Sequence, residues 1–455
     1  MSSPAPTKGL LQLAMPLVVS FWLRQAFVLL DAFYAGQLTG LEDASQAAIG
    51  LTAPFDFLMI AFWVGTSNAL TSRMGAAMGA GQGERIEQLK RATSRIIAFL
   101  VVLFLLIAVA IWFFAERTAL APDTARQFKI YATVLLAGSA FTSFWSILPD
   151  SIVKAHHDTR TTMWAGLLSG GTNAVFNTVF VFVFHWGIFG IALSTVIGRL
   201  AGLVYAQARA NAHERRRLAA ASDNTPGTFE RPLLVLLTLA VPSAITFVLM
   251  ALETFAVNQI LLGQPDSTPL LAAWSVFDRI MRFLAMPLIA VGVATLPLVA
   301  RLWGRQDHSG IRRELRTAML ASLGYVLVVV LPAALFLGPP IARQWTGSEV
   351  TLQLAVQTLP FVPAAVLAMA PLFVLRSAFE GMQRPRPGLF FAVVRSLVLV
   401  VPLVWLAARF GEDFGMSTVQ AVCAAYLVGV GIASAGMHSW MFRDLKRASL
   451  ASRTV

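Results

Sequence analysis

The chain has 455 residues, of which 57% are hydrophobic and 13% are charged, and its formal net charge is +12. Soluble proteins carry about 25% charged residues. Together with a mean hydropathy of +0.70, this composition excludes a water-soluble enzyme built around one apolar core, and it also excludes a disordered chain. The single cysteine, Cys423, excludes a disulfide framework and a thiolate metal cluster. The composition therefore indicates a polytopic membrane protein.

Apolar runs that are long enough to cross a bilayer follow one another along the whole chain. A spanning helix needs about 20 mostly apolar residues, and an open sheet would leave backbone groups unpaired in lipid. The first run lacks a cleavage pattern, so we interpret it as a permanent span. The twelve predicted helices are 12–38, 46–72, 93–115, 130–153, 163–186, 188–208, 233–262, 270–300, 317–338, 356–379, 388–408 and 417–442.

Basic residues gather in the loops on one side of these predicted spans. With the N-terminus inside, most of the 35 Lys and Arg residues lie in cytoplasmic loops, and the opposite loops contain only Arg117, Arg126, Lys129, Arg343 and Arg409. This bias predicts a protein of a bacterial-type cytoplasmic (inner) membrane with both termini in the cytoplasm. It also attributes the positive net charge to topology signals near membrane lipids, with no nucleic-acid partner.

The longest and most polar loop divides the chain into two halves that look like copies. Leu13-Ala14-Met15-Pro16 opens the first span, and Leu239-Ala240-Val241-Pro242 opens the seventh. Other short motifs recur at nearly the same offset, which indicates duplication, although chance matches in apolar text are the alternative. We predict two pseudo-symmetric lobes of six helices, with an N-lobe over 1–210, a cytoplasmic linker over 211–232 and a C-lobe over 233–455.

Four acidic residues lie in the outer half of the membrane within the predicted spans, namely Asp31, Asp56, Glu253 and Asp278. An ionisable group at this depth costs at least about 2.5–3.5 kcal/mol, so it needs a partner, water or a role. Asp278 can pair with Arg282 one turn away, which leaves a structural ion pair and a functional group both open. Asp56 follows Pro54 and can cap a kinked segment.

Asp31 is the strongest candidate for a group that binds a proton or a cation. Its nearest charge in the same helix, Arg24, lies two turns away, about 10 Å along the axis. Polar residues also occur in the fifth and sixth spans, where amides often hold helices together; these are Asn173, Asn177, Ser194 and Thr195. Pro16 precedes Asp31 in the same predicted span and supplies a possible hinge.

With these residues laid out, the chain resembles the multidrug and toxic compound extrusion (MATE) family of antiporters, and most closely its DinF-like branch. The residues that support the resemblance are Pro16, Asp31, Gly36, Gly65, Arg73, Gly75, the turn 154–160, Asn173 and the segment 190–195. The resemblance implies a V-shaped, MOP-type pair of six-helix lobes that exports drugs in exchange for H⁺ or Na⁺.

The resemblance also implies site residues. In the DinF-like branch a coupling and substrate network corresponds here to Asp31, Asn173, Asn177 and Thr195. The branch usually has Asp where this chain has Asn177, so one titratable group remains where the branch often has two. The NorM-like branch uses a span-seven Glu, which Glu253 matches, and a span-ten Asp. Span ten here offers only Arg376, so that sodium site lacks an acid.

We therefore expect a secondary active multidrug efflux antiporter for organic, often cationic compounds, with H⁺ or Na⁺ as coupling ion. The sequence contains no Walker A, H-E-x-x-H or G-x-S-x-G motif, so neither an enzyme nor a metal or cofactor site is predicted. Two alternatives stay open. One is a flippase for lipid-linked oligosaccharide or peptidoglycan precursors, which would use Arg24, Arg279, Arg282, Arg376 and Arg395. The other is a non-transporting membrane scaffold.

Overall fold

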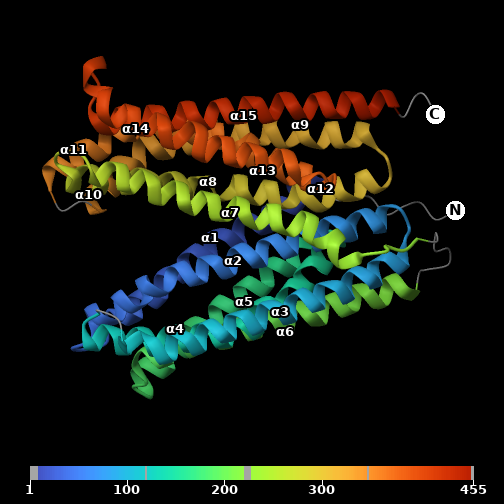
Figure 1. Cartoon of the computed structure of the whole chain (residues 1–455), viewed down its shortest axis with the longest axis horizontal. Helices are drawn as coiled ribbons and strands as arrows, with labels where there is room; N and C mark the ends of the chain where they lie inside the picture. Colours follow the sequence, from blue (N-terminus) through green and yellow to red (C-terminus); the bar gives the residue numbers. More distant parts are fainter. Residues whose placement is uncertain (1–8, 118–119, 220–226, 346–347, 452–455) are drawn as a thin grey trace. The chain divides into compact units, whose positions relative to one another are not determined.

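The computed structural model describes residues 9–117, 120–219, 227–345 and 348–451, and throughout these ranges the regular elements are helical (Figure 1). The side chains of residues 24–29, which include Arg24, are outside the described set, so the predicted spacing between Arg24 and Asp31 is not tested. Among the described residues, eleven helices are long and apolar enough to cross a membrane, and the first helix adds a shorter apolar stretch over Leu10–Leu23. The chain is therefore an all-α polytopic membrane protein, as predicted.

The first half of the chain provides six long helices, which are generally longer than the predicted spans because they extend beyond the apolar run. They are α1 (Leu10–Ala35), α2 (Glu42–Gly79), α3 (Gly83–Phe114), α4 (Pro122–Ala155), α5 (Thr159–Thr178), which continues as the π-helical segment η2 (Val179–Val183), and α6 (Gly187–Ala219).

The second half is more broken, because π-helical segments and prolines interrupt its spans. It contains α7 (Pro232–Leu262), α8 (Ser267–Gly304), α9 (His308–Tyr325) followed by η3 (Val326–Val330) and η4 (Ala333–Leu337), α10 (Gly338–Trp345), α11 (Glu349–Thr358), α12 (Phe361–Gly381), α13 (Pro385–Val393) followed by η5 (Val394–Val400), α14 (Val401–Phe410) and α15 (Thr418–Ala451).

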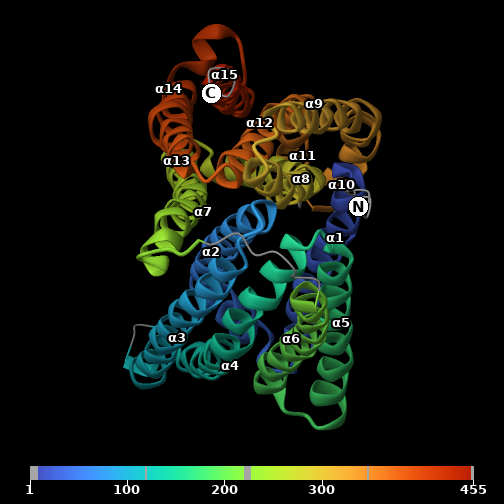
Figure 2. The ribbon, with the colours of Figure 1, turned by 90° about the vertical axis from the view of Figure 1, so that its right-hand side faces the viewer.

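The helices form two compact units. The amino-terminal unit is Gln12–Ala244, and the carboxy-terminal unit contains Ile245 onward with the start of α1. Within the amino-terminal unit α4 contacts α2, α3 and α6, and α5 packs on α6, as the view along the helices shows (Figure 2). Within the carboxy-terminal unit α12 contacts α8 and α15. The division falls inside α7, whereas the sequence predicted it in the linker 211–232.

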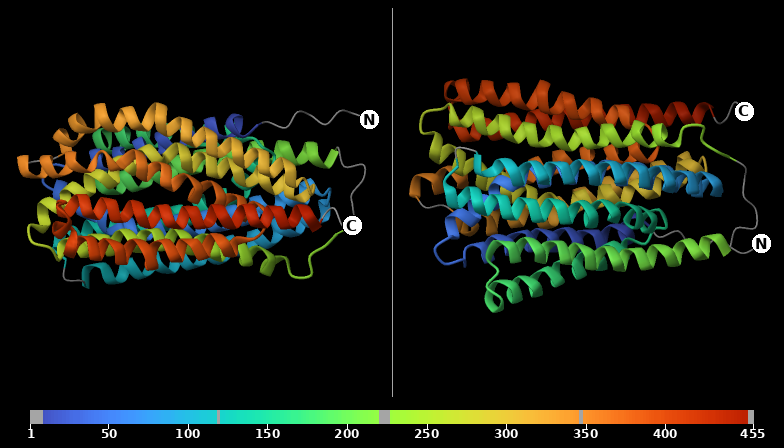
Figure 3. Two further views of the ribbon diagram at one scale, coloured as in Figure 1. Left: turned by 90° about the horizontal axis from the view of Figure 1, so that it is seen from above. Right: turned by 60° about the horizontal axis from the view of Figure 1, so that its bottom comes forward.

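The structure differs from the predicted linker in residues 211–219, which continue α6 as one helix to Ala219 (Figure 3). Residues 220–226 of the predicted linker lie outside the described residues. The extension is held by ion pairs: Glu214 accepts hydrogen bonds from Lys90 Nζ at 2.9 Å and from Arg217 Nη2 at 2.8 Å. The polar residues of this segment are therefore the contacts of a helix end and do not form a flexible loop.

Four helix ends share one hydrogen-bonding pattern and support the predicted duplication. At Gly81, His157, Gln306 and Gln383 the backbone turns left-handed, with φ between 57° and 72°, and each following amide donates to a carbonyl five residues back. This is the Schellman motif. The sequence separation between Gly81 and Gln306 is almost the same as that between His157 and Gln383. Three of the four lack glycine, so the surrounding contacts must hold the left-handed conformation.

Glycines on α6 bring its backbone close to α5. A Cβ at Gly198 would lie 2.5 Å from Ser169 O and 3.0 Å from Asn173 Cβ, and one at Gly202 would lie 2.8 Å from Ala165 O. A larger side chain would therefore push the two helices apart. By contrast, a Cβ at Gly171, on α5, would meet nothing within 4 Å.

We predict that Gly198→Ala destabilises the protein by about 1–3 kcal/mol, because the added methyl overpacks a backbone contact. Gly171→Ala is the matched control, and we expect it to be neutral or to stabilise by up to about 1 kcal/mol through its higher helix propensity. Thermal unfolding of the purified variants in detergent measures both. Equal melting temperatures for the two variants would contradict the close α5–α6 packing.

Asp158 ties the turn between α4 and α5 to the extended end of α6. Its Oδ1 accepts from Thr161 N at 3.3 Å, which caps α5, and its Oδ2 lies 2.8 Å from His213 Nε2. Burial alone would raise the pKa of this carboxyl, but the hydrogen bonds from His213 and Thr161 outweigh burial and hold the pKa below its ordinary value. The ionised form is therefore the one that stabilises the fold.

We predict that the loss of stability on replacing Asp158 depends on whether the new side chain can still accept a hydrogen bond. Asp158→Ala should cost about 1–2 kcal/mol at pH 7, because it removes the cap, while Asp158→Asn keeps an acceptor and should cost less. Because the native pKa is depressed, the stabilisation by the charge is present above the ordinary pKa of about 4 and is lost as the pH falls through the native value. The difference in melting temperature between wild type and Asp158→Asn should thus hold from pH 7 to 5 and shrink below about pH 4. A difference that does not shrink below about pH 4 contradicts this assignment.

Candidate functional site

The structure brings together the four residues predicted as the coupling and substrate network. Asp31 on α1 accepts hydrogen bonds at Oδ1 from Asn177 Nδ2 at 2.9 Å and from Asn173 Nδ2 at 3.3 Å, both on α5. Thr195 Oγ1 on α6 donates to the other oxygen, Oδ2, at 2.9 Å. Three helices therefore supply one carboxylate and three neutral donors.

A second layer of hydrogen bonds orients these donors. Ser194 Oγ donates to Asn177 Oδ1 at 2.6 Å, so the amide nitrogen of Asn177 faces Asp31. Asn177 Nδ2 also lies 3.3 Å from Asn173 Oδ1, and Asn173 Nδ2 lies 3.0 Å from Thr195 Oγ1. Ser194 was noted in the sequence only as a polar residue beside Thr195. The spacing of Asn173 and Asn177, one helical turn apart on α5, is the signal that places both amides on one face.

The other acidic candidate of the amino-terminal unit, Asp56, has a cationic partner. Arg199 Nη2 on α6 lies 3.1 Å from Asp56 Oδ1, and Arg199 Nη1 donates to Ser139 Oγ at 2.6 Å. The sequence analysis did not identify Arg199, which lies one turn beyond Thr195 on the same helix. A pairing between residues 143 positions apart gives no local pattern that could have revealed it.

The acidic candidates of the carboxy-terminal unit are also paired. Glu253 Oε2 accepts from Arg395 Nη2 at 2.9 Å, and the two side chains are only 7% and 6% exposed, respectively. Asp278 accepts from Arg282 Nε at 2.8 and 2.7 Å, which realises the predicted pair one turn apart. Neither acid joins the Asp31 cluster, and neither is available as an uncompensated charge.

Within the described residues, Asp31 is therefore distinguished from the other acids at span depth. The pairs Asp56–Arg199, Asp150–Lys154, Glu253–Arg395, Asp278–Arg282 and Glu380–Arg376 all have N–O distances of 3.2 Å or less. The hydrogen bonds described for Asp31 come from two amides and one hydroxyl, and Arg199, which is paired with Asp56, acts on Asp31 electrostatically without forming an ion pair with it among those described. No group of three or more His, Cys, Asp or Glu residues suited to a metal ion occurs in the part of the chain that the structure describes.

Pro16 lies in the second turn of α1, and the helix continues through it to Ala35. Because proline has no backbone N–H, the helix lacks one internal hydrogen bond at this point. Asp31 follows on the same helix, so a change of helix direction at Pro16 would move the carboxylate relative to α5 and α6.

Comparison with known proteins agrees with this architecture. The MatE family model matches residues 16–179 and again residues 242–406, so the two matches begin at the equivalent prolines Pro16 and Pro242. The chain is 26% identical over 424 residues to the probable multidrug resistance protein NorM of Bradyrhizobium diazoefficiens, covering 88% of this chain and 86% of that protein. It is 23% identical over 341 residues to the probable multidrug resistance protein YoeA of Bacillus subtilis, covering 72% of each chain.

A solved structure shares the fold. The Vibrio cholerae MATE transporter VcmN, in its bent form, superimposes with a TM-score of 0.83 at 22% sequence identity, covering 97% of both chains. The double match to the family model covers more than half of the chain and repeats at the offset seen in the sequence motifs and the helix-end turns. This chain therefore belongs to the MatE family of membrane transporters.

Proposed function

We propose that the protein is a secondary active multidrug antiporter of a bacterial-type inner membrane, which exports organic, often cationic compounds in exchange for a proton. The relatives named as multidrug resistance proteins support the class of substrate. The observation that carries the coupling step is the set of contacts around Asp31, in which neutral donors stand where the other acids have a guanidinium or an ammonium group.

Charge balance gives Asp31 its role in this proposal. Amide and hydroxyl donors stabilise a carboxylate but carry no net charge, and the one guanidinium that acts on Asp31, that of Arg199, is already paired with Asp56. A cation or a proton must therefore supply the balance when the group faces a poorly hydrated environment. A cationic substrate and a proton would then compete for one negative charge. Each must favour a different conformation for the exchange to be coupled.

The direction of the donors favours a proton over Na⁺ as the coupling ion. A Na⁺ site needs several oxygen atoms that point at one centre, by analogy with other hard cations. Here the amide nitrogens of Asn173 and Asn177 point at Asp31 Oδ1, while the Asn177 oxygen accepts from Ser194 and the Asn173 oxygen lies near Asn177 Nδ2. The oxygen atoms are thus engaged away from a common centre.

The flippase alternative has weaker support. The arginines that suggested it are largely compensated, because Arg282, Arg376 and Arg395 each pair with a carboxylate, and Arg279 stacks over Trp345 at 5.3 Å. A lipid-linked pyrophosphate would need several uncompensated cations. A non-transporting scaffold would have no use for the Asp31 carboxylate, whose placement within a membrane span costs free energy.

We predict that Asp31→Asn reduces proton-driven export of an organic cation such as ethidium by about tenfold or more, since coupling free energies of about 1–3 kcal/mol correspond to about 5–150-fold. Proteoliposomes with an imposed pH gradient measure the flux, and the same vesicles with only a Na⁺ gradient should show none. Asp123→Asn, which removes an exposed carboxylate from the first turn of α4, is the control and should transport normally. Full flux in Asp31→Asn would refute the coupling role, and Na⁺-driven flux would refute the choice of ion.

Pro16 is the point at which we expect α1 to bend during transport. Pro16→Ala restores a backbone hydrogen bond in α1 and stiffens it, so we expect the transport rate to fall several-fold while ethidium binding to the purified protein stays within about twofold. Pro122→Ala is the matched control, because Pro122 is at the start of α4, where no intrahelical bond is lost. A Pro16→Ala protein with an unchanged transport rate would show that α1 does not bend there during transport.

A further inference from the structure

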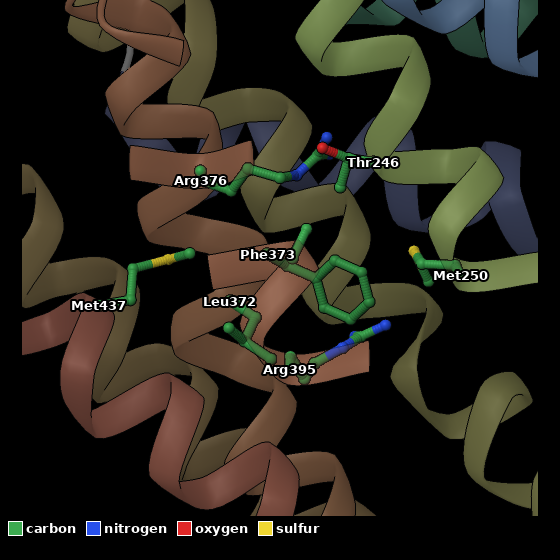
Figure 4. A pocket seen from close by; sticks show the side chains of 9 residues that line it. Thr246, Met250, Leu372, Phe373, Arg376, Arg395 and Met437 are labelled. Atoms are coloured by element: carbon green, nitrogen blue, oxygen red, sulfur yellow. The ribbon is translucent and has the colours of Figure 1, made fainter. Parts of the chain in front are cut away.

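A pocket in the carboxy-terminal unit has a lining that the Asp31 mechanism does not use. It contains about 330 Å³ of empty space, part of which is open to the surroundings, and α7, α12, α13, η5 and α15 contribute its walls. The lining residues are Thr246, Met250, Leu372, Phe373, Arg376, Gly388, Ala392, Arg395 and Met437 (Figure 4). Its charged lining is cationic.

Arg395 presents unused hydrogen-bonding capacity to this pocket. Its side chain is buried, and it donates through Nη2 to Glu253 and to Ser396 Oγ. Its Nε is buried and has no hydrogen-bond partner. A buried donor of this kind costs about 1–3 kcal/mol when it is left unsatisfied. An acceptor bound in the pocket would remove that cost.

Arg376 supplies a second guanidinium on the adjacent wall. It donates through Nη1 to Glu380 at 3.2 Å and lies over the ring of Phe247 at 5.0 Å. This hydrogen bond uses one of its five N–H groups. A Cβ at Gly388 would lie 3.1 Å from Arg376 Cγ, so the glycine leaves room for the stem of this side chain. In Figure 4 the ring of Phe373 lies between the labelled Arg376 and Arg395 side chains.

Glu253 and Glu380, the carboxylates paired with Arg395 and Arg376, determine which ligand charge the pocket can bind. Glu253 and Glu380 hold the guanidinium groups in place but are not part of the lining. They compensate most of the positive charge, so the site does not match a pyrophosphate. The remaining N–H edges still favour one acceptor group with a planar pair of oxygens, because guanidinium forks match carboxylate geometry. The rest of the lining, Met250, Leu372, Phe373 and Met437, is apolar and suits an aromatic or aliphatic body.

We propose that this pocket binds an organic carboxylate, with the carboxylate at the unpartnered Nε of Arg395, Arg376 on the adjacent wall and the apolar body against Phe373 and the methionines. η5 places Arg395 and Ser396 on a π-helical segment, and such segments are often found at functional sites. The proposal concerns a different unit from Asp31 and holds whether or not Asp31 couples transport to a proton.

The test measures equilibrium binding of radiolabelled benzoate to the purified full-length protein in detergent, without any ion gradient. We expect saturable binding of benzoate. Benzyl alcohol, benzylammonium and inorganic phosphate should each bind with an affinity at least about tenfold lower. Benzyl alcohol has the same ring without the charge, benzylammonium has the opposite charge, and phosphate has the charge without the ring. Benzoate that binds no better than any one of the three would overturn the proposal.

Paired substitutions locate the site without leaving a buried charge unpaired. Arg395→Gln combined with Glu253→Gln should weaken benzoate binding about tenfold or more, and so should Arg376→Gln combined with Glu380→Gln. Arg384→Gln combined with Asp444→Asn is the matched control, because it neutralises an ion pair of the same unit outside the pocket, and its affinity should stay within about twofold. If one double variant does not fold, the other and the ligand comparison still decide. Wild-type affinity in either folded double variant would overturn the assignment.

Discussion

The cost of a carboxylate in an apolar surrounding is the constraint on which the interior of this protein depends. Each acid within the spans needs either an opposite charge or enough neutral donors to remain ionised. The described residues show both solutions. Asp56 uses Arg199 and Glu253 uses Arg395, whereas Asp31 is held by two amides and one hydroxyl. Arg199 acts on Asp31 only electrostatically and is paired with Asp56, so the second solution leaves a negative charge that a proton or a cation can balance.

The two halves share a backbone plan but differ in internal charge. Their helix ends turn with the same hydrogen bonds at Gly81 and Gln306 and at His157 and Gln383, and one family model matches both halves. Backbone geometry after duplication is maintained by packing, which tolerates many side chains. Interior charge is free to diverge as long as each change is compensated. The amino-terminal unit has an acid with neutral partners, and the carboxy-terminal unit has arginines with acidic partners.

The sequence was sufficient to predict the helices, because length and apolarity decide what can cross a bilayer. It also placed Asn173 and Asn177 on one face, and the family resemblance joined them to Asp31 and Thr195. Contacts between distant residues were not predictable, because they depend on the rotation of each helix about its axis. The pair Asp278–Arg282 follows from i, i+4 spacing, but the pair of Glu253 with Arg395 joins residues 142 positions apart.

The hydrogen bonds around Asp31 also show how the proposed proton could be accommodated without moving heavy atoms. Oδ1 accepts from the amides of Asn173 and Asn177, which can only donate through their nitrogens. Oδ2 faces Thr195 Oγ1, whose single hydrogen has a second acceptor in Ile191 O at 3.2 Å. A proton on Oδ2 could donate to Thr195 while the hydroxyl hydrogen rotates to Ile191. The threonine therefore gives the cluster two satisfied states, one with Asp31 charged and one with it neutral, as a group that exchanges a proton for a cation requires.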